Sequence, residues 1–555
     1  MQHINLITRR SFLNQSFKTG LAVAMSTLVD IPFVLKKALA EGTIGLNGKK
    51  LLFIWLRGAN DGLNSVIPIQ DDGYYNYGTV ANPIVTRPTI NLLKDPSTNA
   101  GYNTLGDCFD PTQFADVGGT LRTAGQACFS YTNGIALRNG FAALHPSLKF
   151  LAPIYNAGDL ALIHRVGYPR QSRSHFDSQN YWENGNPNNN IVKDGILYRT
   201  ILESGFANTR PLTGVSIQSS LPLILRGPAA AMTNLSDVKR YQLLGIPDAA
   251  AGKAQSMLAA ANGFPAADKK SRELLSLHYE NLINTLPRFT DIVDKLDDVF
   301  LDDVNTDGDF KYNLFPISNA TNGGFTRPGG GTDANKYVVD TGAYTFFQNL
   351  KAAALVLNKT DAIIAGTEVN GSFDTHSNQG GVTGSQPNLL RRIGWAMYAL
   401  RKYFLNNGDQ ASWNNLVVVT LSEFGRTTVE NSDRGTDHAE ASVMFVAGGT
   451  VRGYNKGNST GVFGCSPSDS VPWIPGPPNQ GGNVDGSMFG ISDRYLKRAY
   501  DYRSVLGKII RDHLGATQAQ LNRIVPGYSV AGEHLQSGGT SSIDSTPIIG
   551  EPPIV

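Results

Sequence analysis

The chain has 555 residues, a formal net charge of +2, 41% hydrophobic residues and 17% charged residues. This composition allows a large core, and the length suits one large α/β domain with insertions. The balanced charge, with no basic block, gives no support for nucleic-acid binding.

The N-terminus has the pattern of a twin-arginine export signal. Arg9 and Arg10 precede Ser-Phe-Leu, an apolar run follows, and Ala-Leu-Ala at 38–40 is typical of a cleavage site. We expect residues 1–40 to be a signal peptide that the twin-arginine translocation machinery recognises, and the protein to be periplasmic or secreted. The alternative is an ordinary amphipathic helix, and two lysines just before the cleavage site are atypical of a signal. No other run approaches the ~20 apolar residues of a membrane span, so we expect none in the mature protein.

The first predicted strand is the apolar run at 51–56, which is followed by a lone carboxylate, Asp61. Residues 71–140 are rich in Asn, Gly, Thr and Pro, which indicates a long loop excursion. Within this excursion, Cys108 and Cys128 are either a disulfide pair or two free thiols. Cys465 is the third cysteine, and the three show no metal-ligand spacing.

The middle of the chain combines strands with helices. The spacing of apolar residues predicts a helix over 145–158, a strand over 159–167, and short strands over 214–218 and 221–227. Residues 235–303 have helical periodicity, and we expect them to form a helical cap inserted into the sheet domain.

The C-terminal half alternates strands and helices. We predict strands at 361–369, 415–421 and 442–449, and helices at 388–407 and 501–515. This alternation indicates an α/β fold, with a mainly parallel sheet sandwiched by helices.

We therefore expect one α/β domain over residues 41–530. The tail at 536–555 is rich in Gly, Ser, Thr and Pro, and its composition predicts a flexible segment.

Polar clusters follow the predicted strands repeatedly. Because the carboxyl ends of parallel strands meet at one rim of a sheet, these side chains are expected to converge. Carboxylates and imidazoles are ligands for zinc, manganese or a similar divalent ion; unrelated structural uses are the alternative. The cluster residues are Asp61, Ser174, His175, Asp374, His376, Glu423, Asp437 and His438.

Several motifs together resemble the bacterial domain-of-unknown-function family 1501. They are FIWLRGANDGLNSVIP, LHPSLKFLAPIYNAGDLALIHRVG, RSHFDSQNYWE, GSFDTH, LSEFGRT and GTDHAEASVMFVAGG. That family typically carries twin-arginine signals and is similar to a distant branch of the alkaline phosphatase and sulfatase superfamily. The resemblance implies an alkaline-phosphatase-like α/β core, a divalent-metal site and attack on phosphate or sulfate esters.

The resemblance also implies roles for individual residues. Asp61 matches the first metal carboxylate, and Ser174 matches the nucleophile that opens a helix. Asp374, His376 and His438 match the ligands of one metal ion, although the first two are closer in sequence than is usual.

In the superfamily that the motifs resemble, the second metal ion usually requires an Asp-His pair after a late strand, and here the corresponding residues are Glu423 and Phe424. Since phenylalanine cannot bind a metal, the alternatives are a site for one ion or a different geometry that includes Asp437 or His175.

Other candidate residues have two interpretations each. Ser174, with Asp177 three residues later, also fits a helix cap. Arg173 and Arg426 match the geometry of an anionic ester, and salt bridges are the alternative. His145 and His164 are expected to be structural.

A loop from Asp303 has partial calcium-binding spacing but carries Leu314 at the twelfth position. It predicts either a weak calcium site or a polar turn.

The leading hypothesis is an exported metal-dependent hydrolase. Ser174 would attack the phosphate or sulfate ester of a small anionic compound or a polysaccharide, with a divalent ion (zinc, manganese or calcium) as cofactor. The alternative is a non-catalytic binding or surface-assembly protein that keeps a structural metal or anion site.

Overall fold

The computed structural model describes most of the α/β domain. The described residues are 44–78, 83–92, 102–104, 134–207, 212–230, 232–236, 253, 256, 301–302, 312–313, 315, 339–476, 487–490, 494–529 and 532–555. Four predicted features lie outside these residues: the signal peptide, nearly all of the helical cap, Cys108 with Cys128, and most of the calcium-like loop.

The core is a nine-stranded sheet with the order β10-β9-β13-β1-β14-β15-β8-β16, and β17 also pairs with β8. Among these strands, β15 runs antiparallel to its neighbours β14 and β8, while the other pairings are parallel. This mostly parallel sheet confirms the predicted α/β class. The strands are β1 (Lys50–Leu56), β8 (Leu160–Gly167), β9 (Gly214–Ile217), β10 (Thr233–Leu235), β13 (Ile364–Glu368), β14 (Leu416–Ser422), β15 (Ser442–Ala447), β16 (Val462–Phe463) and β17 (Tyr500–Asp501).

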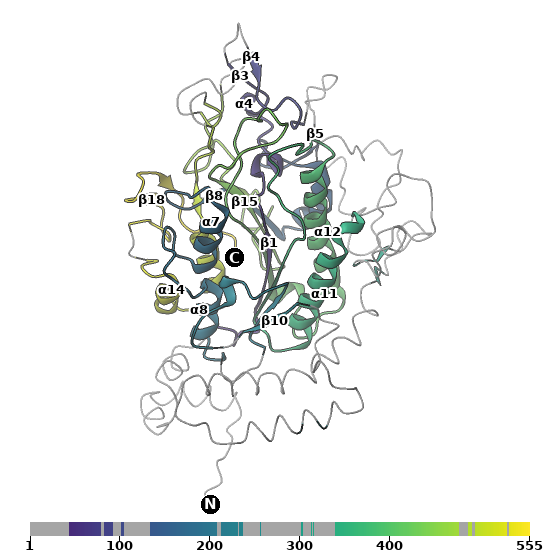
Figure 1. Cartoon of the computed structure of the whole chain (residues 1–555), viewed down its shortest axis with the longest axis vertical. Helices are drawn as coiled ribbons and strands as arrows, with labels where there is room; N and C mark the ends of the chain where they lie inside the picture. The colour runs from purple at the N-terminus through teal and green to yellow at the C-terminus, as the bar shows by residue number, and fades with distance from the viewer. Residues whose placement is uncertain are drawn as a thin grey trace, which may run out of the picture.

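Helices cover both faces of the sheet (Figure 1). Successive side chains of a strand point to opposite faces, so β1 contributes Leu52 and Ile54 to one hydrophobic core and Phe53 and Trp55 to the other. The first core is closed by α11 (Tyr344–Lys359) and α12 (Ser385–Asn406). The second is closed by α7 (His175–Asn184), α8 (Ile196–Glu203), α13 (Tyr502–Lys508) and α14 (Gln518–Ile524).

Shorter elements connect these layers. Part of the predicted 71–140 excursion pairs into a small sheet with the order β2-β7-β6-β5. The short elements are η1 (Gly62–Asn64), β2 (Val66–Ile67), α4 (Asp72–Tyr75), β3 (Asn76–Gly78), β4 (Pro83–Val85), β5 (Tyr102–Thr104), β6 (Gly134–Ala136), β7 (Ala143–Leu144), η2 (Pro146–Leu151), α6 (Ala152–Asn156), η3 (Leu223–Leu225), β11 (Leu301–Asp302), β12 (Tyr312–Asn313), η5 (Thr341–Ala343), η6 (Trp413–Asn415), η7 (Ile509–His513), β18 (Gly539–Thr540) and β19 (Pro547–Ile548). Every helix in the described ranges is too short or too polar to cross a bilayer.

The predicted strand at 221–227 is wrong, because this segment forms the 3-10 helix η3. Pro222 precedes the helix, and the buried Glu183 carboxylate accepts the backbone N–H of Ile224 at 2.9 Å. A side chain rather than a neighbouring strand therefore satisfies this backbone. The predicted helix at 501–515 is also interrupted, since α13 continues into the π-helix η7.

The C-terminal tail packs against the domain, where its composition predicted a flexible segment. Strands β18 and β19 pair with each other, and Ile549 forms a bridge with Tyr500 at the edge of the main sheet. Ile548 and Ile554 are buried, with 3% and 0% exposure. These apolar residues anchor the tail despite its polar and proline-rich surroundings.

Three buried histidines have structural roles, which were predicted for His145 and His164. The rings of His145, His164 and His513 bond the backbone carbonyls of Gly381, Val66 and Lys50 at 2.8, 3.0 and 2.8 Å. Burial lowers the pKa of each ring to about 4.

These three rings make the fold sensitive to acid. Each ring titrates near pH 6.5 when unfolded but near 4 when folded, so its contribution is complete above 6.5 and is lost as the pH falls toward 4. We expect each ring to cost about 1.4 kcal/mol per pH unit in that window. Urea unfolding of the wild type and of His164→Gln at pH 7 and pH 5 checks this. Gln keeps a donor and an acceptor, so the variant should lose less stability between the two pH values; an equal loss contradicts the prediction.

Candidate metal centre

Four side chains converge at one rim of the sheet, and we call them the His/Asp cluster. His175 opens α7 after β8, and two further members follow β13. The fourth precedes β15, and since β15 is antiparallel, its start lies at the rim where its neighbours end. The members are His175, Asp374, His376 and His438.

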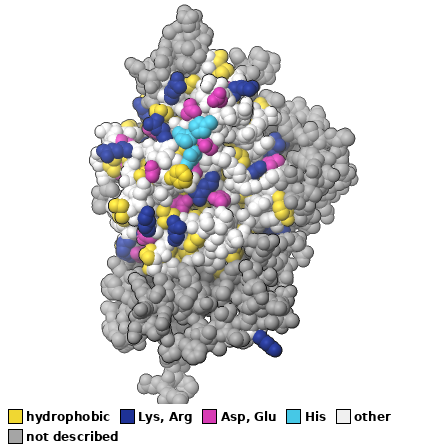
Figure 2. Space-filling view, viewed as in Figure 1, with side chains coloured by type: hydrophobic (Ala, Val, Ile, Leu, Met, Phe, Trp, Pro, Cys, Tyr) yellow, Lys and Arg dark blue, Asp and Glu magenta, His cyan; other side chains and the backbone are white. Residues whose placement is uncertain are grey.

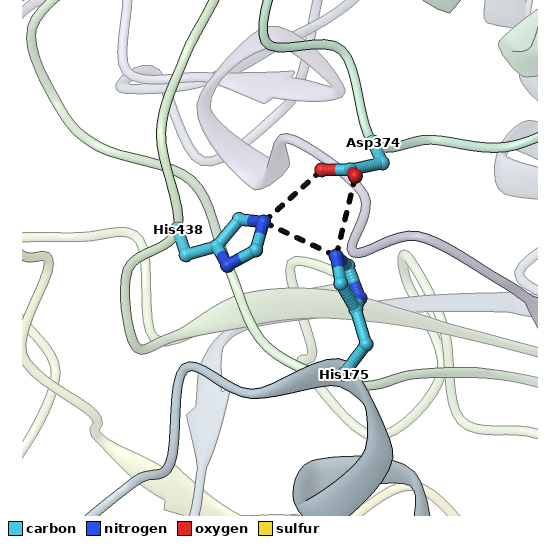
Figure 3. Close-up of side chains that lie close together, drawn as sticks. All are labelled: His175, Asp374 and His438. Carbon is cyan, nitrogen blue, oxygen red and sulfur yellow. Dashed lines mark hydrogen bonds and ion pairs between the residues drawn. The ribbon is translucent and has the colours of Figure 1, made fainter.

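The cluster is compact, and three of its members are drawn in Figure 3. Nε2 of His438 lies 3.1 Å from Nε2 of His175 and 2.8 Å from Nε2 of His376. The Asp374 carboxylate lies 3.1 Å from His438, 3.0 Å from His376 and 3.4 Å from His175. The predicted ligands Asp374, His376 and His438 are therefore brought together, and His175, predicted as catalytic, joins them.

The second ring nitrogen of each histidine, Nδ1, lies close to an oxygen atom of a neighbouring residue. Nδ1 of His438 lies 2.7 Å from the Arg173 carbonyl oxygen, and Nδ1 of His376 lies 3.0 Å from Asp437 Oδ1. Nδ1 of His175 lies 3.5 Å from Glu423 Oε2. Because a carbonyl or a carboxylate only accepts, the Nδ1 atoms carry the protons in the neutral rings. The Nε2 lone pairs then point at one another, an arrangement that is favourable when a metal ion lies between them or when one ring carries a second proton.

The spacing also fits a metal ion. Ligand atoms at ~2.0–2.1 Å from a tetrahedral ion lie about 3.3 Å apart. The donor atoms of His175, Asp374 and His438 lie 3.1–3.4 Å from one another. His376 lies close to His438 and Asp374, at 2.8 and 3.0 Å, but is not part of this mutually close group. Imidazole nitrogens suit zinc and related transition metals, whereas calcium prefers oxygen ligands.

The cluster is reachable from solvent. The side chains of His175, Asp374, His376 and His438 are 24%, 33%, 44% and 25% exposed. Figure 2 shows histidine side chains gathered on one face, with acidic and basic groups around them. A small solute can therefore approach this centre directly.

Charge at the cluster is set by its neighbours. Burial acts to raise the pKa of Asp374, but the hydrogen bond and charge of Arg426, with His438 and His376, lower it to about 2. The hydrogen bond with Glu423 raises the pKa of His175, while burial lowers the pKa of His438. Asp374 is thus ionised at neutral pH and ready to neutralise a cation.

Arg426 was predicted to hold an ester, but its guanidinium is buried and forms hydrogen bonds with groups of the protein. It is 1% exposed, and its guanidinium donates to the carbonyls of residues 58, 59, 373 and 436 at 2.5–3.1 Å. It also donates to Asp374 Oδ1 at 2.5 Å. This buried arginine ties together the loops that carry the cluster.

Glu423, predicted as a ligand, lies behind His175. Its buried carboxylate accepts from Gly58 N at 2.8 and 3.1 Å and from Gln179 Nε2 at 2.5 Å. The Phe424 ring packs against His175 and His438, with centroids 4.8 and 4.7 Å apart. These two residues support the rings from behind, which agrees with a centre for one ion.

Asp61 follows β1 and organises a layer of buried polar residues next to the cluster. It is fully buried and caps η1 by accepting from Leu63 N and Asn64 N at 3.1 and 3.4 Å. Its carboxylate also pairs with Arg87 at 2.6 Å and accepts from Gln379 at 2.7 Å. All of these partners are protein groups, so the structure favours the capping interpretation over metal binding.

Gln379 connects this layer to both ligand loops. Its Oε1 accepts the hydroxyl of Thr375 at 3.0 Å and the hydroxyl of Thr436 at 2.6 Å. Thr375 lies between two cluster members in the sequence, and Thr436 is two residues before His438. Asp61 fixes the other end of the Gln379 amide, so one side chain sets the spacing of the loops.

The remaining predicted residues lie at the edge of the centre. Ser174 is exposed and caps α7, with its Oγ accepting from Asp177 N at 3.4 Å. Arg173 is exposed, and its guanidinium lies 4.5 Å from the Tyr495 ring centroid. Asp437 is 51% exposed and orients His376.

Sequence reasoning missed Gln379 and Arg87, because an amide and an arginine in polar loops carry no recognisable spacing. Gly58 offered a signal, because a glycine directly after a strand can mark a close approach. Its φ is +97°, and a Cβ there would lie 2.5 Å from the backbone nitrogen of Asp374.

We expect Gln379→Ala to weaken metal binding without removing a ligand. Losing a group that orients ligands typically costs 10–100-fold in metal affinity, and a similar loss is expected here because both ligand loops are released. Competition with a chelator measures the affinity. Gln410→Ala, at an exposed position, is the control and should bind as the wild type does; a wild-type affinity in Gln379→Ala would refute the role of this amide.

Comparison with curated proteins and with solved structures gives no match. Residues 337–464 match the model of the family described as protein of unknown function (DUF1501), the family that the motifs resemble, and this segment contains Asp374, His376 and His438.

Proposed function

We propose that the His/Asp cluster binds one divalent transition-metal ion, and that the protein uses it to hydrolyse a phosphate or sulfate ester. The observation that carries the proposal is that the Nε2 atoms of three histidine rings lie close to the Asp374 carboxylate. The Nδ1 atom of each ring lies close to an oxygen acceptor of another residue. Zinc and manganese suit these donors best.

The ion would act as a Lewis acid toward an ester oxygen. The chain itself supplies the other groups. Asp374 and the three rings hold the ion, and Ser174, directly before His175, is the candidate nucleophile. Its Oγ attacks phosphorus or sulfur, the bond to the alcohol breaks, and the alcohol leaves with the serine proton. Water then hydrolyses the phosphorylated or sulfated Ser174, which releases phosphate or sulfate and restores the hydroxyl. The exposed Arg173 is placed to attract the anionic substrate.

Metal analysis and ester assays on the purified protein test this function. We expect about one ion per chain and hydrolysis of 4-nitrophenyl phosphate or 4-nitrophenyl sulfate. Ser174→Ala should lower kcat at least ~1,000-fold at unchanged metal content, while Ser529→Ala, at another exposed serine, should not. Unchanged kcat in Ser174→Ala would remove the nucleophile from the proposal.

A second candidate is a binding or assembly protein with a structural metal ion. Four protein donors already complete the coordination of a typical structural zinc site, which favours this candidate. In that case no ester is hydrolysed, and removing the metal lowers only the thermal stability.

We also propose export by the twin-arginine route, supported by Arg9 and Arg10 in the N-terminal sequence. Changing both to lysine should leave the precursor in the cytoplasm, as cell fractionation would show; normal export would contradict the proposal.

A further inference from the structure

A cavity of about 240 Å³ lies beside the metal centre, among the described residues. Its lining includes Arg170, Gln171, Glu440, Tyr495, Lys497 and Arg498. It is smaller than the ~300–1,000 Å³ pockets that enclose a whole drug-sized ligand, so it suits one group of a larger molecule.

The cavity and the metal centre share structural elements. The Arg173 carbonyl accepts from Nδ1 of His438, and the Arg173 guanidinium covers the ring of Tyr495 in the cavity wall. Glu440 is two residues after His438. Gln171 donates to the Glu423 carbonyl at 2.9 Å and also lines the cavity. A molecule of moderate length therefore reaches both places along Arg173.

The lining favours an anion. Its cationic side chains are Arg170, Lys497 and Arg498, against the carboxylates of Glu440 and Asp544. The Asp544 carboxylate is already engaged, since it accepts from Arg498 at 3.1 Å and from the backbone N–H of Arg170 at 3.4 Å. Arg498 is balanced by Asp544, Asp501 and Glu533. Arg170, Lys497 and, at the edge, Arg173 then outnumber the remaining carboxylate, Glu440.

Arg498 closes the buried side of the cavity. The residue is 4% exposed, and its guanidinium nitrogens pair with Asp501, Glu533 and Asp544 at 3.1 Å, which fixes the guanidinium plane. Arg170 and Lys497 also line the cavity and are exposed, so they are the cations that an oxyanion entering it would meet.

We propose that this cavity binds a second anionic group of the substrate whose ester lies at the metal centre. The preferred substrates therefore carry two anionic groups, each a sulfate, phosphate or carboxylate. This inference rests on the proposed function for the ester, but the cavity's affinity for an anion can be measured without catalysis.

Calorimetric titration of the metal-loaded protein with inorganic sulfate tests the cavity. We expect the double variant Arg170→Ala/Lys497→Ala to lose at least tenfold in sulfate affinity at unchanged metal content. Lys359→Ala, in an exposed ion pair with Asp409, is the matched control and should bind as the wild type does. Equal affinity in the double variant and the wild type, or no sulfate binding by the wild type, overturns the proposal.

Ester kinetics then separate the two proposals. The double variant should raise KM for an ester that carries a second anionic group at least tenfold more than it raises KM for 4-nitrophenyl phosphate. Equal effects on both esters overturn the cavity's role in substrate choice. If the wild type hydrolyses no ester, the proposed function fails while the sulfate titration still decides the cavity.

Discussion

We expect the replacement of His438 with alanine to reduce the divalent metal at the proposed site from about one ion per chain to almost none. Nε2 of this residue contacts both other rings and the Asp374 carboxylate, so it lies at the centre of the cluster. Loss of a ligand leaves the remaining donors facing one another without compensation, and we expect the metal affinity to fall by far more than the 10–100-fold typical of an orienting residue. Elemental analysis after dialysis measures the metal content.

The control is His534→Ala, which removes an exposed histidine from the C-terminal segment. It should retain the metal and any ester hydrolysis. A His438→Ala protein that still holds one ion with wild-type affinity would show that the ion, if any, binds elsewhere.

Replacing Arg426 with methionine will destabilise the protein by about 3–5 kcal/mol, because several buried backbone carbonyls lose their donor at roughly 1–3 kcal/mol for each unsatisfied group. The side chain is buried and satisfies the carbonyls of Gly58, Ala59, Phe373 and Thr436. Methionine fills similar space but donates no hydrogen bond, so these acceptors and Asp374 are left unpaired. Equilibrium unfolding in urea measures the loss.

Arg426→Lys is the informative companion, because lysine keeps the charge beside Asp374 but cannot reproduce the fork of donors. We expect it to lose less stability than the methionine variant. If both variants unfold at the wild-type urea concentration, Arg426 is not the tie between the ligand loops that its contacts indicate.

The sequence predicted the sheet and the rim well because both depend on local pattern. The runs that became β1, β8 and β14 are buried along their whole length, β13 is buried except at its last residue, Glu368, and polar clusters follow each of these strands. The direction of β15 was not accessible, because strand polarity depends on pairing. Only the reversed direction explains why His438, which precedes its strand, meets residues that follow theirs.

The sequence identified the residues near the candidate site better than it identified the role of each one. A carboxylate after a strand looks the same in sequence whether it is enclosed by protein donors or faces a cluster of histidines. Asp61 is enclosed by Arg87 and Gln379, which are 26 and 318 residues away from it, whereas Asp374 lies beside three imidazole rings. Arg426 was likewise indistinguishable from an exposed anion-binding arginine until its burial was known.

The position of β1 has a consequence for how the chain folds during synthesis. Although β1 is made first among the strands, it lies between β13 and β14 at the centre of the sheet, and Gly58 bonds to Glu423 across 365 residues. Its neighbours emerge from the ribosome only after most of the chain has been made. Until then a strand that is apolar except for Lys50 has exposed edges, so the nascent protein needs protection from aggregation. Folding should also be slow, because the central contacts of the sheet join residues that are distant in sequence.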